Sequence, residues 1–514
     1  MSAERPSSLP DDSLAAPELR AKALNGLRWV VFAKPATEVI LLGSTVVLAR
    51  LVTPAEFGRF AVAMIAGSLA VIPLAGVTAA LVQRPAVSSE HLRSGVAVAW
   101  LIGLGLALLT LLAASLVVTP LYGSRTAEFV RLTAPLCLIT AAGAVPGAKL
   151  QRRLAIRRTS VIELCGTVTR VLASIGMALA GLEGFALVFG WLLGELVEVA
   201  ASWLSAPPPL PRLHLGPTRE LLSFGLPASL AAASWLGFRN CDYAIIGARL
   251  GALQTGFYFR AYTLGVDYQK KISSVMNTVG FPALARTQNR DEREDLREKM
   301  VRALTLLIFP LLVLLAIEAP VVVPWLFGHR WAPAVLPTQI LAVGGASTLV
   351  ADTVGSALMA SGRARSVMAF GWGHFVVYAT AVFFTAPLGI VAVAIAASVV
   401  HTLFLVISYV LLLRGQSSSA FARLWHDVKP ALVCSVAPAI AALPFSLLLR
   451  SLALAPLPYV LAVSAVGVCS YVLALRLVYP ESFRGLGRLA GHLLPSPGSR
   501  RWRRRIEPLA TSAR

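Results

Sequence analysis

The chain has 514 residues, of which 57% are hydrophobic and only 14% are charged, and its formal net charge at pH 7 is +21. The charged share is about half of that in a typical soluble domain, and a soluble protein of this composition would expose large apolar patches. Composition therefore excludes an ordinary soluble globular protein and indicates a lipid bilayer as the solvent.

Apolar runs of about 20 residues recur along the chain, and each is long enough to cross a hydrocarbon core as a helix. Helices are expected because backbone polar groups in lipid must be paired within the segment, and the alternation of a membrane barrel is absent. The sequence therefore predicts an all-α integral membrane protein of about fourteen transmembrane helices. The predicted spans are 23–49, 57–82, 95–119, 128–148, 160–181, 183–205, 223–248, 254–284, 301–326, 335–361, 365–386, 388–413, 430–449 and 456–478.

These spans divide into two sets of six and a final pair. Before the first span, residues 1–22 are polar and show no cleavable signal peptide. The predicted parts are a cytoplasmic N-terminal segment (1–22), an N-terminal six-helix bundle (23–205), a cytoplasmic connector (206–222), a C-terminal six-helix bundle (223–413), a cytoplasmic loop (414–429), two extra transmembrane helices (430–478) and a basic cytoplasmic tail (479–514).

Lysine and arginine gather in alternate loops, and this bias predicts the orientation of a membrane protein. The loops on one side are rich in basic residues, whereas the opposite loops hold only Arg50, Arg125, Arg131, Arg249, Arg330 and Arg450. Both termini are therefore expected in the cytoplasm. The arginine-rich stretch 501–505 is expected to contact anionic lipid rather than nucleic acid.

One phrase occurs twice: "ARLVTPAEFGRF" begins at residue 49 and "ARLGALQTGFYF" at residue 248. The predicted chain crosses the membrane six times between them, so both copies occupy equivalent places in two parallel repeats related by an axis along the membrane normal. Each copy is expected at a turn, where its glycine permits a tight bend and its aromatic residue anchors at the interface. These residues are Gly58 with Phe60, and Gly256 with Tyr258.

Span 254–284 carries polar residues at intervals of three and four, which places them on one face of a helix. Charges at membrane depth usually face a wet cavity or a partner, so this stripe is expected to line a pathway. The alternative is a re-entrant or shorter helix whose charges lie among the lipid headgroups. The stripe comprises Arg260, Thr263, Asp267, Lys270, Ser274 and Asn277, with Lys271 at its edge.

Several short segments, in order along the chain, resemble the polysaccharide-biosynthesis flippases of the multidrug/oligosaccharidyl-lipid/polysaccharide exporter superfamily. They are "LARLVTPAEFGRFAVA", "AALVQRP", "GAKLQRRLAIRR", "LLSFGLPAS", "DYAIIGARLGALQTGFYFRAYTL", "GFPALARTQ" and "WLFGHRWAPAV". The greatest similarity is to the branch associated with exopolysaccharide and colanic-acid-like export. The resemblance covers residues 22–415.

The resemblance implies two six-helix bundles arranged in a V, with two extra C-terminal helices. It implies movement of undecaprenyl-pyrophosphate-linked oligosaccharide across the bacterial inner membrane, with polymerase and export machinery as candidate partners. A monomer is expected, because a pseudo-symmetric pair of bundles already encloses a pathway. The family has no tight catalytic signature, so no site residue is carried over from it. No cofactor is expected, and coupling to H⁺ or Na⁺ is left open.

A pyrophosphate cargo would need cations in a cavity of low dielectric. Candidate cations are Arg28, Lys34, Arg239, Arg260, Lys270 and Lys271. A buried carboxylate could couple transport to an ion, since burial favours its neutral form. The candidate coupling carboxylates are Glu38, Asp267 and Asp352, although Glu38 lies four residues from Lys34 and the two can neutralise each other.

Two other readings keep the fold but change the cargo, to a small molecule exchanged by an antiporter or to a peptidoglycan precursor. A membrane glycosyltransferase or polymerase is less favoured, because such enzymes usually need a larger soluble region. The longest internal polar stretch, residues 285–300, is expected to be a solvated amphipathic connector. The five cysteines fall in apolar spans without a CxxC pair and predict free thiols rather than a metal site.

Overall fold

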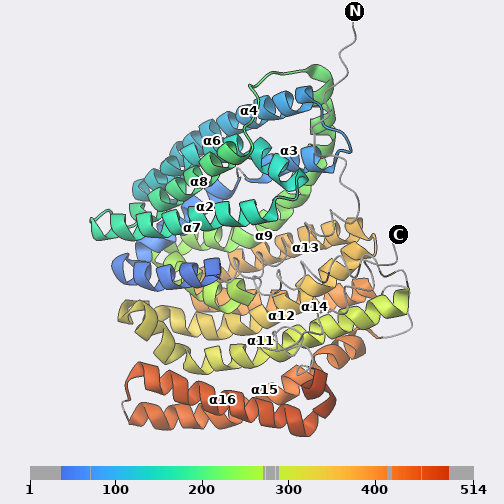
Figure 1. Cartoon of the computed structure of the whole chain (residues 1–514). Helices are drawn as coiled ribbons and strands as arrows, with labels where there is room; N and C mark the ends of the chain where they lie inside the picture. The colour runs from blue at the N-terminus through green and yellow to red at the C-terminus, as the bar shows by residue number, and fades with distance from the viewer. Residues whose placement is uncertain are drawn as a thin grey trace, which may run out of the picture. The chain divides into compact units, whose positions relative to one another are not determined.

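In the computed structural model, every regular element among the described residues is a helix (Figure 1). The described residues are 36–69, 71–269, 289–413, 419–452 and 454–485, with single positions 273, 280, 284 and 287. A helix over residues 36–51 comes first. It is followed by α2 (Pro54–Leu69), α3 (Val71–Gln83), α4 (Ser89–Ala113), the π-helical η1 (Ala114–Val118), α5 (Thr119–Tyr122), α6 (Ser124–Arg152), α7 (Ile156–Leu179), α8 (Phe185–Ser205), α9 (Leu215–Tyr262) and the π-helical η2 (Thr263–Asp267).

The second half of the chain continues with α11 (Arg290–Phe327), the 3₁₀ turn η3 (His329–Ala334), α12 (Val335–Ala360), α13 (Ala364–Thr385), the 3₁₀ turn η4 (Ala386–Leu388), α14 (Ile390–Leu412), α15 (Ala420–Ser451) and α16 (Pro456–Val478). Helix α9 consists of two helical segments joined at a kink, because Gly251 interrupts it with a positive φ of 81°. Glycine tolerates that backbone conformation without strain.

Eleven helices in the described ranges are long and apolar enough to cross a membrane. They coincide with eleven of the fourteen predicted spans, from the second span at Pro54–Gln83 to the last at Pro456–Val478. The three other predicted spans are 23–49, 223–248 and 254–284. The first and last of these include residues outside the described ranges, and the middle one runs along α9.

The described residues form two compact units. The first draws on Met1–Asp267, Val322–Gly344 and Arg363–Phe404, and the second on Tyr268–Val321, Gly345–Gly362 and Leu405–Arg514. Several long helices, such as α11 and α14, contribute residues to both units.

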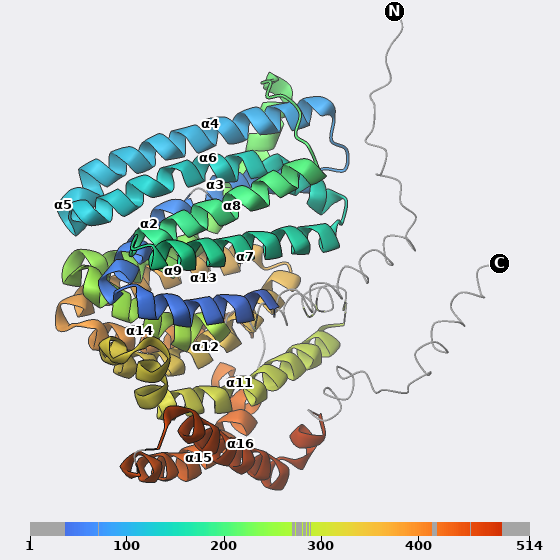
Figure 2. The same cartoon turned by 60° about the vertical axis from the view of Figure 1, so that its left-hand side comes forward.

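Within the first unit, α4, α6 and α8 pack side by side, and α7 packs along α8 (Figure 1 and Figure 2). Small residues allow the close approach. A Cβ at Gly103 of α4 would lie 2.6 Å from the Cβ of Ala141 on α6, and one at Gly190 of α8 would overlap the Oγ atom of Ser174 on α7. Glycine, alanine and serine at such crossings are typical of helix packing in membranes, where van der Waals contact provides much of the association energy.

The two copies of the repeated phrase meet each other at a crossing of α2 and α9. A Cβ at Gly58 would overlap the carbonyl oxygen of Ala252, and a Cβ at Gly256 would overlap the carbonyl oxygen of Pro54. The expectation that these glycines permit tight turns is therefore wrong, because both lie inside helices. They are small so that two backbones can touch at equivalent points of the two copies of the phrase.

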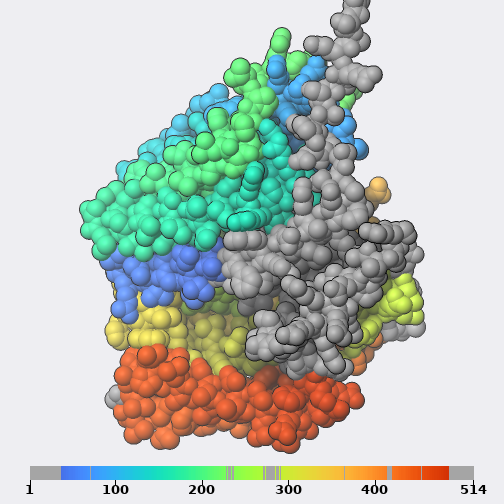
Figure 3. All heavy atoms as spheres, viewed as in Figure 1, coloured from blue at the N-terminus to red at the C-terminus, as the bar shows by residue number. Residues whose placement is uncertain are grey.

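Within the second unit, α15 and α16 pack together and against α11. Their shared core includes Leu314 and Ile317 of α11, Ala442 of α15, and Tyr459 and Val463 of α16. The outer side of α15 and α16, red in Figure 3, carries exposed leucine, valine and isoleucine side chains. Examples are Leu432, Val436, Ile440, Leu461 and Leu473. An apolar surface of this kind suits contact with lipid.

The stretch predicted to be a solvated connector is instead the start of α11 from Arg290 onward. Charged pairs four residues apart, Lys299 with Asp295 and Arg302 with Glu298, support the helix beyond the apolar span. Arg297 in this stretch is fully buried, so the prediction of a solvated segment is wrong for its inner face. The five cysteines are free thiols, as predicted.

Candidate functional site

Two arginines join the ends of helices at one end of the first unit. Arg330, just after α11, donates from Nη2 to the carbonyl oxygens of Ala49 (2.8 Å) and Arg50 (2.6 Å), in the last turn of helix 36–51. Arg50 in turn donates to the carbonyl oxygens of Trp325 and Leu326 in the last turn of α11. The final carbonyls of a helix have no partners within it, so each arginine caps the helix of the other. We call this pair the arginine clasp.

Beside the clasp, Arg260 of α9 is only 2% exposed and is surrounded by aromatic rings. Its guanidinium carbon lies 4.6 Å from the ring centre of Phe57, 4.9 Å from that of Phe327 and 5.2 Å from that of Trp331. Trp331 also donates from Nε1 to the carbonyl oxygen of Ala49 (2.9 Å). Cation–π contacts stabilise a desolvated guanidinium, and here they tie α2, α9 and the end of α11 together.

A buried carboxylate forms the second notable site in this unit. Asp242 of α9 is 0% exposed, and its Oδ2 accepts a hydrogen bond from the hydroxyl of Tyr378 on α13 (2.9 Å). The Tyr378 hydroxyl is in turn 3.3 Å from that of Tyr258. The Oδ1 atom accepts from the backbone N–H of Tyr243 (2.9 Å). A carboxylate removed from water is retained only when such partners satisfy it.

Two histidines extend this network on α13 and α14. The Nε2 atom of His374 lies 3.3 Å from Nδ1 of His401, and both rings are buried. His374 stacks on Phe404 with ring centres 4.2 Å apart, and the ring of His401 lies 5.1 Å from that of Tyr378. We call Asp242, Tyr258, Tyr378, His374 and His401 the acid–tyrosine–histidine network. It brings groups that can exchange protons together in an apolar bundle.

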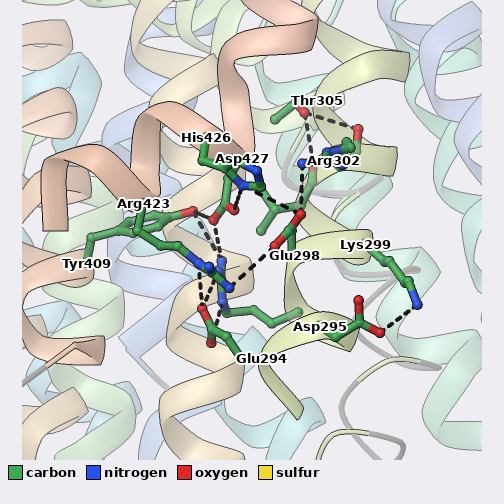
Figure 4. Close-up of polar contacts among 12 residues, drawn as sticks. Glu294, Asp295, Glu298, Lys299, Arg302, Thr305, Tyr409, Arg423, His426 and Asp427 are labelled. Carbon is green, nitrogen blue, oxygen red and sulfur yellow. Dashed lines mark hydrogen bonds and ion pairs between the residues drawn. The ribbon is translucent and has the colours of Figure 1, made fainter. Parts of the chain in front are cut away.

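The second unit contains a buried ion-pair cluster where α11 and α15 begin (Figure 4). Arg297 donates from Nη1 to Asp427 Oδ2 (2.7 Å) and from Nη2 to Glu294 Oε1 (2.7 Å), and its side chain is 1% exposed. The Tyr409 hydroxyl donates to the same Asp427 oxygen (2.6 Å). Burial alone would lower the pKa of Arg297, but Glu294, Tyr409 and Asp427 outweigh it and raise the pKa above its ordinary value. The guanidinium therefore stays charged.

A model of the polysaccharide biosynthesis protein family matches residues 47–336, which is more than half of the chain. The chain belongs to this family. Among its relatives is an uncharacterized membrane protein in the cps region of Klebsiella pneumoniae, 25% identical and covering 77% of this chain and 83% of the relative. Another is the lipopolysaccharide biosynthesis protein WzxC of Escherichia coli strain K12, 27% identical, covering 67% of this chain and 71% of the relative.

Among solved structures, the fold matches the lipid II flippase MurJ in an inward closed conformation, with a TM-score of 0.68 and 12% identity. The match covers 88% of this chain and 98% of that structure. The family identifies the chain as a polysaccharide biosynthesis protein, the eleven candidate spans indicate a multi-pass membrane protein, and the MurJ match shows the fold that it shares.

The predicted polar stripe of this family member is only partly within the described residues. Arg260 lies in the aromatic cage, and the hydroxyl of Thr263 donates to the carbonyl of Phe259 in its own helix (2.8 Å). Asp267 Oδ1 lies 3.7 Å from Arg239 Nη2. The π-helical turn Thr263–Asp267 changes the helical register on which the predicted stripe depends. Lys270, Lys271, Ser274 and Asn277 lie outside the described residues.

The remaining predicted site residues are scattered. Glu38 is half-buried in helix 36–51, and Asp352 of α12 is exposed rather than deeply buried. Arg28 and Lys34 lie outside the described residues. None of these positions tests the predicted roles, which stay predictions.

Sequence reasoning misses the acid–tyrosine–histidine network. Spacing along the chain presents Asp242 only as a partner for Arg239 on the same helix, and it presents the two histidines singly. A usable signal is present, since His374 and Tyr378 are four residues apart and share a helix face. The contacts of α13 with α9 cannot be inferred from spacing within either helix.

Proposed function

We propose that the protein is an alternating-access flippase that moves undecaprenyl-pyrophosphate-linked oligosaccharide across the bacterial inner membrane for exopolysaccharide or O-antigen assembly. The observation that carries this proposal is membership of the polysaccharide biosynthesis family over residues 47–336. The finer architecture belongs to the same proposal. In it, fourteen helices form two parallel six-helix bundles and an extra C-terminal pair. The two bundles form a V and are related by a pseudo-twofold axis along the membrane normal. Both termini lie in the cytoplasm, and the protein works as a monomer.

The contacts between the two repeats support a carrier with one closed end. The crossing of Gly58 with Gly256 and the arginine clasp both lie near the ends of the repeated phrase, on the side predicted to be non-cytoplasmic. Alternating access requires this end to open, since cargo must leave there. Backbone contact at glycines and hydrogen bonds to exposed carbonyls are interactions that can separate without leaving a buried charge.

We propose that the acid–tyrosine–histidine network is the ion-coupling site and that the Asp242 carboxylate binds the coupled ion. A wholly buried carboxylate in a membrane bundle is a group that can take up and release an ion between two conformations. Glu38, Asp267 and Asp352 remain candidates from the sequence. Asp242 has the stronger case because it is fully buried and hydrogen-bonded across two helices.

We propose that the cargo pyrophosphate is bound by cations near the pathway. Arg28, Lys34, Lys270 and Lys271 remain candidates. Arg239 is 40% exposed and near Asp267, so it is accessible for this role. Arg260 would first have to leave its aromatic cage, and a role in holding the closed end fits it better.

The experiment is controlled shut-off of the gene in its native host, followed by mass spectrometry of extracted lipid-linked oligosaccharides and assay of surface polysaccharide. We expect complete undecaprenyl-pyrophosphate-linked repeat units to accumulate and surface polysaccharide to fall. Wild type should rescue both, whereas Arg239→Ala and Lys270→Ala should rescue poorly.

Accumulated peptidoglycan precursor would instead indicate a peptidoglycan-precursor flippase. Normal lipid-linked pools with normal surface polysaccharide would contradict the glycan cargo and leave a small-molecule antiporter. Polymerase and export machinery are candidate partners in the proposed assembly pathway.

A further inference from the structure

The cluster in the second unit contains three electron-pair donors that converge on one point. Glu298 of α11 contributes Oε1, and His426 and Asp427 of α15 contribute Nδ1 and Oδ1 (Figure 4). The His426 Nδ1 atom lies 3.6 Å from Glu298 Oε1 and 3.8 Å from Asp427 Oδ1, and all three atoms lie within 4.8 Å of one another. Two carboxylate oxygens and an imidazole nitrogen at this range form a set of donors that a single cation can join.

Asp427 provides the second observation. Its side chain is 0% exposed, and its Oδ2 atom is fully occupied by Arg297 and Tyr409. The Oδ1 atom is buried and has no hydrogen-bond partner among the described residues. A buried carboxylate oxygen without a partner is energetically unfavourable. The two donors on Oδ2 fix the carboxylate so that Oδ1 points towards His426, as outer-shell partners do for metal ligands.

We propose that Glu298, His426 and Asp427 form a binding site for a divalent transition-metal ion such as Zn²⁺. An imidazole nitrogen with two carboxylate oxygens is a donor set that Zn²⁺ accepts, with solvent in the fourth position. Zinc with bonds of about 2.0–2.2 Å holds tetrahedral ligands roughly 3.3–3.6 Å apart. The two distances from His426 Nδ1, 3.6 and 3.8 Å, are close to this range, and the two carboxylate oxygens, which lie within 4.8 Å of each other, would move together when the ion binds.

A proton on His426 explains the arrangement less well. A single N–H can donate along one direction, and both carboxylate oxygens are beyond the usual hydrogen-bond length from Nδ1. A metal ion at the centre would engage all three atoms at once. It would tie the start of α11 to the start of α15 and thereby hold the C-terminal helix pair in place, independently of the cargo that the transporter carries.

The neighbouring arginines set the site's affinity. Arg302 Nη2 donates to Glu298 Oε1 (2.8 Å), the same oxygen that would bind the metal, and Arg423 Nη2 lies 3.4 Å from Glu298 Oε2. Arg302 is 31% exposed, so it can turn to solvent when the ion binds. Arginine and metal therefore compete, and removal of Arg302 should strengthen metal binding.

The test is calorimetric titration of Zn²⁺ into the full chain, purified without a histidine tag and stripped with a chelator, at pH 7.5. We expect one saturable site. His426→Ala should weaken binding at least about tenfold, since it removes one of three ligands from an exposed side chain. Arg302→Gln should tighten binding about two- to fivefold, because it removes an exposed competing ion pair.

Lys299→Gln is the matched control, because Lys299 lies on the same helix but pairs with Asp295 outside the site. All variants keep the five cysteines, so thiol binding is common to them. Equal Zn²⁺ affinity in wild type and His426→Ala overturns the proposal. An absence of saturable Zn²⁺ binding by the wild-type chain also overturns it.

Discussion

Asp242 is the residue whose chemistry bears most directly on the proposed ion coupling. Replacement by Asn keeps an acceptor for the Tyr378 hydroxyl but removes the ability to exchange a proton or bind a cation strongly. We expect Asp242→Asn to fold and insert normally while transport falls by about tenfold or more. The measurement is surface-polysaccharide output at matched protein levels in a shut-off strain.

Asp352→Asn is the control, because that carboxylate is exposed on α12. It should retain transport if Asp242 is the coupling group. The reverse pattern, with Asp352→Asn inactive and Asp242→Asn active, would return the assignment to the carboxylates predicted from the sequence.

Arg297 tests the energetics of a buried ion pair. Arg297→Met leaves Asp427 buried without its charged partner, and loss of one member of such a pair destabilises by about 3–5 kcal/mol. We expect a clear fall in the thermal unfolding temperature in detergent. The double change Arg297→Met with Asp427→Leu should recover most of the loss. A double variant as unstable as the single one would mean that packing, rather than charge, is responsible.

Glu294 gives the cluster a predictable pH dependence. Burial works to raise the pKa of this carboxyl, but the hydrogen bonds and charge of Arg297, with the charge of Arg423, outweigh it and hold the pKa below its ordinary 4.5. The residue lies in the charged first turns of α11, before the predicted span 301–326. Its stabilising contribution is therefore fully present above the ordinary pKa and is lost as pH falls through the lowered one.

We expect the stability difference between wild type and Glu294→Gln to be constant from about pH 8 to pH 5 and to shrink at lower pH. Thermal denaturation in detergent across a pH series measures it. Asp295→Asn, which alters only an exposed pair with Lys299, should show little difference at any pH. A gap that widens on acidification would contradict the sign of the pKa change.

Among the helices, the crossing of α2 with α9 is the most sensitive to a single methyl group. A Cβ at Gly58 or Gly256 would overlap a backbone carbonyl of the opposing helix, which no rotamer change can relieve. We expect Gly58→Ala and Gly256→Ala each to destabilise the closed crossing by about 1–3 kcal/mol. Labelling of A252C by a membrane-impermeant maleimide should increase in both variants.

Gly43→Ala is the matched control, since its Cβ would meet no atom within 4 Å. It should leave the labelling of A252C unchanged. Equal labelling in all three backgrounds would mean that the crossing does not separate the compartments.

The helices themselves can be predicted because each depends on a local property, a long apolar run. The contacts between helices cannot be predicted in this way, because they depend on residues that are far apart in the sequence. Gly58 and Gly256 are recognisable as a repeated pattern, but only the opposing backbone shows why each must be glycine. The start of α11 is predicted wrongly because Arg297 is charged, and its burial depends on Asp427, 130 residues away in sequence. The stripe after Arg260 does not extend regularly because a π-helical turn changes the spacing.

For the whole molecule, the candidate site is the least predictable part. Intramembrane charge is a sound local signal, and it finds Arg239, Arg260 and Asp267. Whether a charge lines a pathway or closes an aromatic cage depends on rings from other helices, as Phe57 and Trp331 show for Arg260. The acid–tyrosine–histidine network likewise arises only where α9, α13 and α14 meet.

Topology is the property of the whole chain that most directly tests the proposed architecture. Fourteen crossings place both termini on one side, whereas thirteen would place them on opposite sides. The basic loops put that side in the cytoplasm. We expect S7C and S512C to be protected from impermeant maleimide in intact cells and labelled after permeabilisation. E183C, in the short turn between α7 and α8, should be labelled in intact cells.

The eleven candidate spans in the described ranges leave the first, seventh and eighth crossings to this experiment. Two of these crossings flank the repeated phrase in the second half, so an error there would break the equivalence of its two copies. Labelling of S512C but not S7C in intact cells would mean an odd number of crossings. If the missing crossing is the seventh, the two copies of the phrase would lie in segments running in opposite senses, and a parallel two-repeat carrier would be the wrong description.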